Sequence, residues 1–143
     1  MRDLHNNLGL SIALPAAEYD ADNTPAAIDL LGFESALIAI SVGAGGITFS
    51  GTNKIEFKLT HSDDDSDYSA VTVDDVQGLS AVGTGGIILA LTSAHASPSV
   101  TKVGYVGGKR YLKLLADFSG THGTGTPIAA LVVKGNAHER PVA

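Results

Sequence analysis

The sequence of 143 residues contains no cysteine and no tryptophan. The absence of cysteine excludes a disulfide scaffold, thiol catalysis and thiolate zinc sites. Charged residues make up only 17% of the chain, against roughly 25% in an average globular protein. No apolar run approaches the ~20 residues of a membrane-spanning helix, and the polar residues 2–7 do not resemble a secretory signal. These absences favour one soluble domain.

Glycine, by contrast, is abundant, with 17 residues scattered without the triplet period of collagen. Most of these glycines separate short apolar segments, which is typical of turns between strands. Leu, Ile and Val are frequent enough to fill a core. The composition therefore indicates a folded domain with many turns.

Helical periodicity is nearly absent, and residues 15–19 are the best short helical candidate. Short apolar or alternating segments recur instead, bounded by Gly, Asp, Asn, Ser or Pro. About nine short strands are predicted, at residues 8–14, 27–31, 36–42, 54–61, 68–73, 87–91, 101–106, 111–118 and 128–133. Without strand–helix alternation, this spacing indicates an all-β fold, an antiparallel β-sandwich of the jelly-roll or Greek-key type.

Two of these segments differ in pattern. Residues 54–61 alternate with period two, which predicts Ile55, Phe57 and Leu59 on the core face. Residues 36–42 are apolar almost throughout and resemble a buried strand.

The ends of the chain lack a strand pattern. We divide the sequence into an N-terminal arm at 1–7, a β-sandwich domain at 8–135 and a C-terminal tail at 136–143. Such ends are either frayed or ordered against a neighbouring molecule.

Charge is uneven along the chain: residues 1–100 carry a net charge of −10 and residues 101–143 a net charge of +4. An acidic body with a mildly basic last third argues against nucleic acid as a partner, because binding to phosphates requires a dense basic stripe. The asymmetry is compatible with head-to-tail docking of like subunits or with docking on a charged partner.

Two glycine-rich segments, at 43–46 and 83–86, invite a phosphate-loop interpretation. Neither completes the G-x-G-x-x-G motif, because Thr48 and Ile88 occupy the place of the third glycine, and no helix is predicted to follow. We interpret both as β-turns that need positive φ.

The acidic run from Asp63 to Asp67 has the D-x-D-x-D opening of a calcium loop, but Tyr68 replaces the required glycine. A solvated hairpin tip and an adventitious cation site both remain open.

No catalytic constellation is recognisable. The five histidines are widely spaced in or beside predicted loops and termini, without H-E-x-x-H spacing, and no G-x-S-x-G elbow occurs. The sequence therefore predicts a non-enzymatic protein, with no catalytic, cofactor-binding or metal-binding residue and no cofactor.

Basic and aromatic residues gather near the start of the last third. Tyr105 and Tyr111 flank Lys109 and Arg110 in a predicted hairpin. The segment is either a basic, aromatic-flanked contact patch or a hairpin whose tyrosines pack on the sheet.

Four segments of the chain resemble small proteins encoded in the head-structure modules of tailed phages and prophages. They are RDLHNN (2–7), KIEFKLTHSDD (54–64), KVGYVGGKRYL (102–112) and DFSGTHGTGTPI (117–128). Those proteins include capsid decoration, or cement, proteins bound to the outside of the shell. The resemblance covers most of the chain, but its motifs are structural, so no functional residue carries over individually.

The resemblance implies a virion structural protein assembled in the host bacterial cytoplasm and located on the outer capsid surface. Its partners would be the major capsid protein and further copies of itself, as a trimer on a capsid symmetry axis, with neither nucleic acid nor membrane bound. The candidate partner contacts are Arg2, Leu4 and His5 in the arm, with Tyr105, Lys109, Arg110 and Tyr111. The alternatives are a tail, connector or fibre component, and a carbohydrate- or cell-surface-binding β-sandwich.

Overall fold

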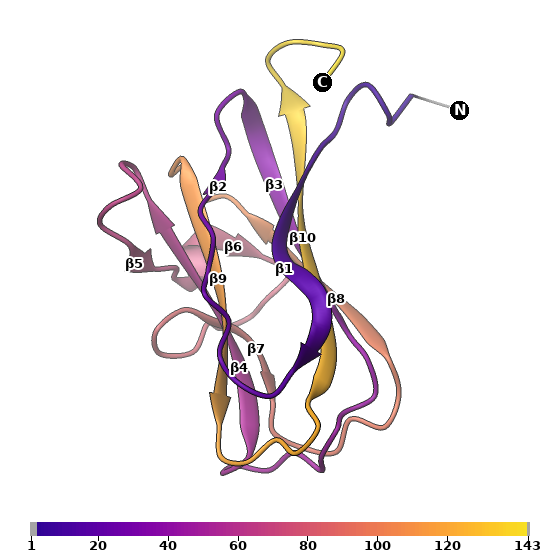
Figure 1. Ribbon diagram of the computed structural model, residues 1–143. Coiled ribbons are helices and arrows are strands. Elements are labelled where there is room, and N and C mark those ends of the chain that lie inside the picture. Colours follow the sequence, from indigo (N-terminus) through magenta and orange to yellow (C-terminus); the bar gives the residue numbers. More distant parts are fainter. Residues whose placement is uncertain (1–2, 143) are drawn as a thin grey trace.

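The computed structural model describes residues 3–142, and the architecture of this part of the chain is all-β (Figure 1). Its strands are β1 (Gly9–Tyr19), β2 (Ile28–Asp29), β3 (Phe33–Val42), β4 (Lys54–Ser62), β5 (Ser69–Ala70), β6 (Val76–Gln77), β7 (Ile87–Leu91), β8 (Ser99–Tyr105), β9 (Tyr111–Ser119) and β10 (Thr126–Ala137). A single 3₁₀ turn, η1 (Val73–Asp75), accompanies them in this range. No helix in residues 3–142 has the length and apolar character needed to cross a membrane.

The strands form two antiparallel sheets. The first sheet has the order β1-β10-β3-β8-β6, and the second has the order β2-β9-β4-β5, with β7 also paired to β4. The predicted all-β sandwich is therefore confirmed, with ten strands where about nine were expected.

The pairing is nested from the ends of the domain toward its middle. β1 pairs with β10, β2 with β9, β3 with β8 and β4 with β7, always antiparallel. The two halves of the chain therefore run as the arms of one long hairpin that is rolled across two sheets. This is the topology of a jelly roll.

The core lies between the two sheets. Ile55, Phe57 and Leu59 on β4 are fully buried, as the period-two pattern predicts, and they face β3 residues such as Ile38 and Ile40 across the sandwich. Each such side chain stabilises the fold by roughly 1.5–3 kcal/mol through removal of apolar surface from water. These contacts fix the relative position of the two sheets.

The segment 36–42, which resembles a buried strand in sequence, is buried on one face only. Ile38, Ile40 and Val42 point into the core, but Leu37 and Ala39 between them are only half-buried, and Ser41 is exposed. The segment lacks alternation because the residues that point away from the core are themselves mostly apolar. This outward side of the sheet is described below.

Residues 15–19, the best short helical candidate, are not helical, because this segment completes β1. Ala17 pairs with Ile128 and Glu18 with Pro127, while register shifts on either side of Leu14 bend the strand. Pairing with β10 thus overrides the local helical propensity of Ala and Glu. The predicted strand at 68–73 is likewise shortened to β5, followed by η1.

The segment between Tyr105 and Tyr111 is not a hairpin. β8 belongs to the first sheet and β9 to the second, so residues 106–110 cross from one sheet to the other. The last strand, β10, runs to Ala137, two residues into the predicted tail. Beyond it, the Val142 N–H donates to the Asn6 carbonyl at 3.1 Å, which joins the two terminal segments at one end of the sandwich (Figure 1).

Candidate functional site

The predicted contact residues within residues 3–142 lie at the end of the sandwich where the terminal segments meet. Leu4 and His5 are exposed beside Leu8 and Val142, whereas Arg2 lies outside the described residues. Tyr105, Lys109 and Arg110 line a different hollow, which opens between the β2–β3 connection and the β8–β9 crossover. The structure therefore brings the two groups to one end of the fold without placing them around a common cavity.

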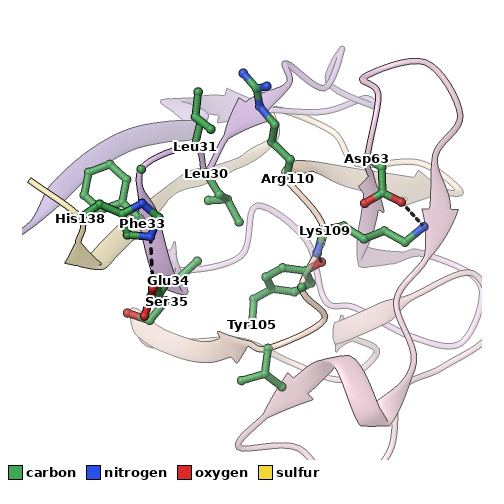
Figure 2. Close-up of a pocket in the computed structure, with 14 residues that line it drawn as sticks. Leu30, Leu31, Phe33, Glu34, Ser35, Asp63, Tyr105, Lys109, Arg110 and His138 are labelled. Carbon is green, nitrogen blue, oxygen red and sulfur yellow. Dashed lines mark hydrogen bonds and ion pairs between the residues drawn. The ribbon is translucent and has the colours of Figure 1, made fainter.

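Figure 2 shows the hollow beside the crossover, whose volume is about 460 Å³. Leu30, Leu31 and Phe33 supply apolar lining from the β2–β3 side. Tyr105 and Lys109 border it from the crossover. The lining is mainly apolar.

Tyr105, predicted as a contact residue, is buried. Its hydroxyl lies 2.9 Å from Nδ1 of His61 on β4, and it accepts a hydrogen bond from the Lys109 backbone N–H at 3.1 Å. With the Lys109 N–H occupying an acceptor position, the Tyr105 O–H is free to donate to a neutral His61 ring. Tyr105 therefore joins the two sheets and fixes the crossover, rather than presenting its ring to a partner.

Burial dominates the titration of this pair. It lowers the pKa of His61 below its usual value, although the Asp75 carboxylate acts in the opposite direction. Burial also raises the pKa of Tyr105. Both groups are thus held neutral near pH 7, as the hydrogen bond requires.

The cations of the crossover each face an acidic residue. Arg110 makes two hydrogen bonds to Asp29, of 2.9 and 2.7 Å, and lies 4.8 Å from the centre of the Tyr111 ring. Lys109 Nζ lies 3.5 Å from the Asp63 carboxylate. The hydrogen bonds from Arg110 lower the pKa of Asp29 to about 2. The segment therefore presents paired charges instead of a bare basic patch.

The acidic run folds into the tip of the β4–β5 hairpin. Asp64 organises this tip, because its carboxylate accepts hydrogen bonds from the backbone N–H groups of Asp67 and Ser66 and from the Ser62 hydroxyl. These bonds lower the pKa of Asp64 to about 2. In residues 3–142 no group of three or more His, Cys, Asp or Glu side chains is placed to hold a metal ion.

Two of the five histidines, each expected in or beside a loop or terminus, are buried. His61 is on β4, as described, and His122 packs against the rings of Phe49 and Phe118. His122 Nε2 donates a hydrogen bond to the Ser119 carbonyl oxygen, 2.8 Å away. Both side chains are therefore part of the interior.

The two glycine-rich segments serve different purposes. Gly85 and Gly86 adopt positive φ in a turn, as predicted. Gly46 does not need positive φ; instead a Cβ at this position would lie 1.8 Å from the Gly125 carbonyl oxygen. The first loop therefore uses glycine for a close backbone approach.

The outer surface of the second sheet is charged and polar. Lys54 pairs with Glu56 at 2.7 Å along β4, and Lys58 pairs with Asp117 across to β9. Lys113 lies 4.0 Å from the centre of the Tyr68 ring. Such a surface is suited to contact with water, because burying its ion pairs would cost desolvation and gain little.

The outer surface of the first sheet differs sharply. Residues that point away from the core stand side by side across four strands, as the strand registers show. We call this surface the outer apolar face; its members are Leu10 and Ile12 on β1, Ala129, Leu131 and Val133 on β10, Leu37 and Ala39 on β3, and Val100 on β8.

Much of the outer apolar face is open. The exposed fractions are 66% for Leu10, 63% for Ile12, 42% for Leu131 and 74% for Val100. Contiguous apolar patches of this kind on a single molecule mark interaction sites. This surface, absent from the predicted contact residues, is the candidate functional site.

The sequence does contain a signal for this surface. In strands with one wet face, polar residues alternate with apolar ones, as at residues 54–61. Residues 36–42 and 128–133 lack that alternation. Both belong to the first sheet, so the missing polar residues mark its outer face.

No family model matches the sequence, and no curated protein matches it. A solved structure described as "Bacillus endospore appendages form a novel family of disulfide-linked pili" aligns over 94% of this chain and 95% of that chain, with 11% sequence identity and a TM-score of 0.35. Similarity at this level carries no functional argument for the present chain.

Proposed function

We propose that this chain is a non-enzymatic structural protein of a phage virion, a decoration protein that binds the outside of the assembled head and stabilises the shell. Its partners are the major capsid protein and further copies of itself in a closed homo-oligomer, a trimer on a capsid symmetry axis. The observation that supports an assembly role is the contrast between the two outer surfaces of the jelly roll: one carries ion pairs, and the other is an exposed apolar face.

The phage context comes from the resemblance of the segments at 2–7, 54–64, 102–112 and 117–128 to head-module proteins. A jelly roll is a common architecture of viral capsid domains, and of lectins as well. A lectin reading has less support, because the outer apolar face contains no aromatic side chain on which a sugar ring would stack.

Function would follow from many repeated contacts. A subunit that binds only the assembled lattice stabilises it by mass action, since every bound copy favours the assembled state. If each oligomer contacts several capsid subunits at once, avidity raises the overall affinity well above that of one contact. Neither effect requires a catalytic residue or a cofactor.

The test is cosedimentation of the purified chain with assembled heads, and separately with tails, of the phage or prophage that encodes it. The proposal predicts saturable binding to heads and none to tails. Binding to tails alone would assign the chain to the tail or connector. A glycan array that binds the chain, combined with no binding to heads, would support the carbohydrate alternative.

The predicted contact of the arm is tested in the same assay. Leu4, 67% exposed, is replaced in a Leu4→Ser variant, and Val73→Ser on η1 serves as the control at another exposed position. If the arm docks on the shell, Leu4→Ser weakens head binding and Val73→Ser does not. Equal binding by both variants would exclude Leu4 from the contact.

A further inference from the structure

The outer apolar face is a surface feature that the internal packing leaves unexplained. Its three rows run across β1, β10, β3 and β8, for example Ile12, Leu131 and Ala39, with Lys102 next in the same row. At about 4.8 Å per strand and 3.4 Å per residue, four strands and five residues give a footprint of roughly 19 Å by 17 Å.

That footprint, roughly 320 Å², lies within the range of the largest apolar patch on a typical monomer. A standard interface buries about 800 Å² of accessible surface per partner, with an apolar centre and a polar rim. The outer apolar face supplies such a centre. Ser41 and Lys102 on its rows, and Gln77 on β6 beside it, supply a rim.

Charge indicates which partner fits. The chain has a net charge of −6, so two copies repel one another over most of their surfaces. No acidic residue belongs to the rows of the outer apolar face, and Lys102 is their single charged member. Two acidic copies can therefore approach one another through this face without direct repulsion between acidic side chains.

The edge strand β1, which borders the face, also favours a second copy as the partner. Among the described residues, β1 pairs only with β10, and no charged residue occurs in it before Glu18. Exposed edge strands are normally protected by charges, proline, bulges or a covering segment, and in β1 Pro15 and the register shifts around Leu14 protect only the second half, so residues 9–12 stay open. The free border of β9 shows such cover, because Asn23 bonds the Leu114 carbonyl and the Ala116 N–H.

We propose that the outer apolar face is the surface through which copies of this chain pack together. This inference rests on the self-association that forms part of the proposed function, and it assigns that contact to the first sheet. The second sheet, with its ion pairs, then remains in contact with solvent, and the opposite ends of the sandwich remain free for the shell. A second copy is the occupant because the face offers it apolar complementarity without charge repulsion.

The experiment measures the mass of the full chain in solution by sedimentation equilibrium, for the wild type, Leu131→Glu and Val73→Glu. Leu131 and Val73 have nearly equal exposure, 42% and 43%, but only Leu131 lies on the face. The wild type and Val73→Glu are expected to form the same closed oligomer. Leu131→Glu is expected to raise the dissociation constant at least ~100-fold, because it places like carboxylates in an apolar contact.

A second variant guards against a folding defect. Val100→Lys changes the opposite border of the face at its most exposed side chain, and circular dichroism verifies the fold of each variant. A folded Leu131→Glu or Val100→Lys variant that keeps the wild-type mass would overturn the inference, as would a monomeric wild type at roughly 0.1 mM. An oligomer disrupted by both face variants, but not by Val73→Glu, establishes the contact.

Head binding separates this inference from the proposed function. A face-dependent oligomer that does not cosediment with heads would leave the contact standing and refute the decoration role. A monomeric wild type that nevertheless decorates heads would refute the contact alone. A face-dependent dimer would support the contact and contradict the trimer expectation.

Discussion

The hydroxyl of Tyr105 offers the sharpest test of how the two sheets are joined. Tyr105→Phe removes one oxygen atom and keeps the ring. Two groups then lose their partner: Nδ1 of His61, which lies 2.9 Å away, and the backbone N–H of Lys109, at 3.1 Å. Tyr105 and His61 are both about 5% exposed, so water does not readily replace the lost bond at the ring.

The magnitude follows from the burial of each orphaned group. A buried polar atom left without a partner costs about 1–3 kcal/mol. The His61 nitrogen falls in that range, whereas Lys109 is half-buried and its N–H regains part of its bond from water. We expect a loss of about 2–3 kcal/mol in the free energy of unfolding. For a chain of this size that corresponds to a fall of roughly 4–12 °C in Tm.

The assay is urea denaturation at fixed protein concentration, since self-association would otherwise alter the apparent stability. Tyr111→Phe is the matched control, because the Tyr111 hydroxyl makes no hydrogen bond with residues 3–142 and the side chain is half-buried. The control is expected to stay within about 0.5 kcal/mol of the wild type. A Tyr105→Phe protein equal in stability to Tyr111→Phe would refute the proposed linkage between β4, β8 and the crossover.

The remaining predictions concern backbone packing and pH. Gly46→Ala forces a Cβ against the Gly125 carbonyl and is expected to cost at least ~2 kcal/mol in urea denaturation, whereas Gly51→Ala, with open space around it, changes stability by less than about 0.5 kcal/mol. The pKa of His61 is lower in the folded chain than in the unfolded chain, so below about pH 6.5 the unfolded chain takes up a proton that the folded chain does not, and the free energy of unfolding falls as the pH drops. His61→Gln is expected to reduce this fall of stability with decreasing pH. A variant whose stability depends on pH as steeply as that of the wild type would contradict the prediction. Asp29→Asn removes an exposed ion pair with Arg110 and is expected to lower the free energy of unfolding by less than about 1 kcal/mol at pH 7. Because the pKa of Asp29 in the folded chain is about 2, the stabilisation by this pair is lost only between about pH 4 and 2. In that pH range the urea denaturation midpoint of the variant is expected to vary less than that of the wild type.

The core residues of a strand could be predicted from the sequence only where the other side of the strand carries polar residues. The alternation at residues 54–61 gave Ile55, Phe57 and Leu59 as core residues, because the other side of β4 carries the charged groups of the second sheet. At residues 36–42 both sides are apolar, so periodicity did not separate core from surface. The two-residue β6 was missed because its sequence is too short to carry a period.

The candidate site was predictable only in part. Tyr105 was recognised as unusual, but its burial depends on His61, 44 residues away in sequence, and no local pattern reports that contact. Likewise, the short segment at 15–19 resembles a helix until β10 pairs with it. The outer apolar face can be recognised only when the register of its four strands is known. The sequence alone shows only that two of these strands lack the alternation of polar and apolar residues.

The nested pairing also has a kinetic consequence. Gly9 pairs with Lys134, so the first strand cannot complete its ladder until almost the entire described chain has left the ribosome. At about 5–20 residues per second, that delay is roughly 6–25 s. Contacts between such distant segments make jelly rolls slow to fold, because much of the loop-closure entropy is lost before the pairing energy is gained. During this interval β1 and β3 both lack β10, their common neighbour, and expose apolar residues to other nascent chains. Yield in the host is therefore expected to depend on temperature and chaperone supply more strongly than the equilibrium stability of the finished fold would indicate.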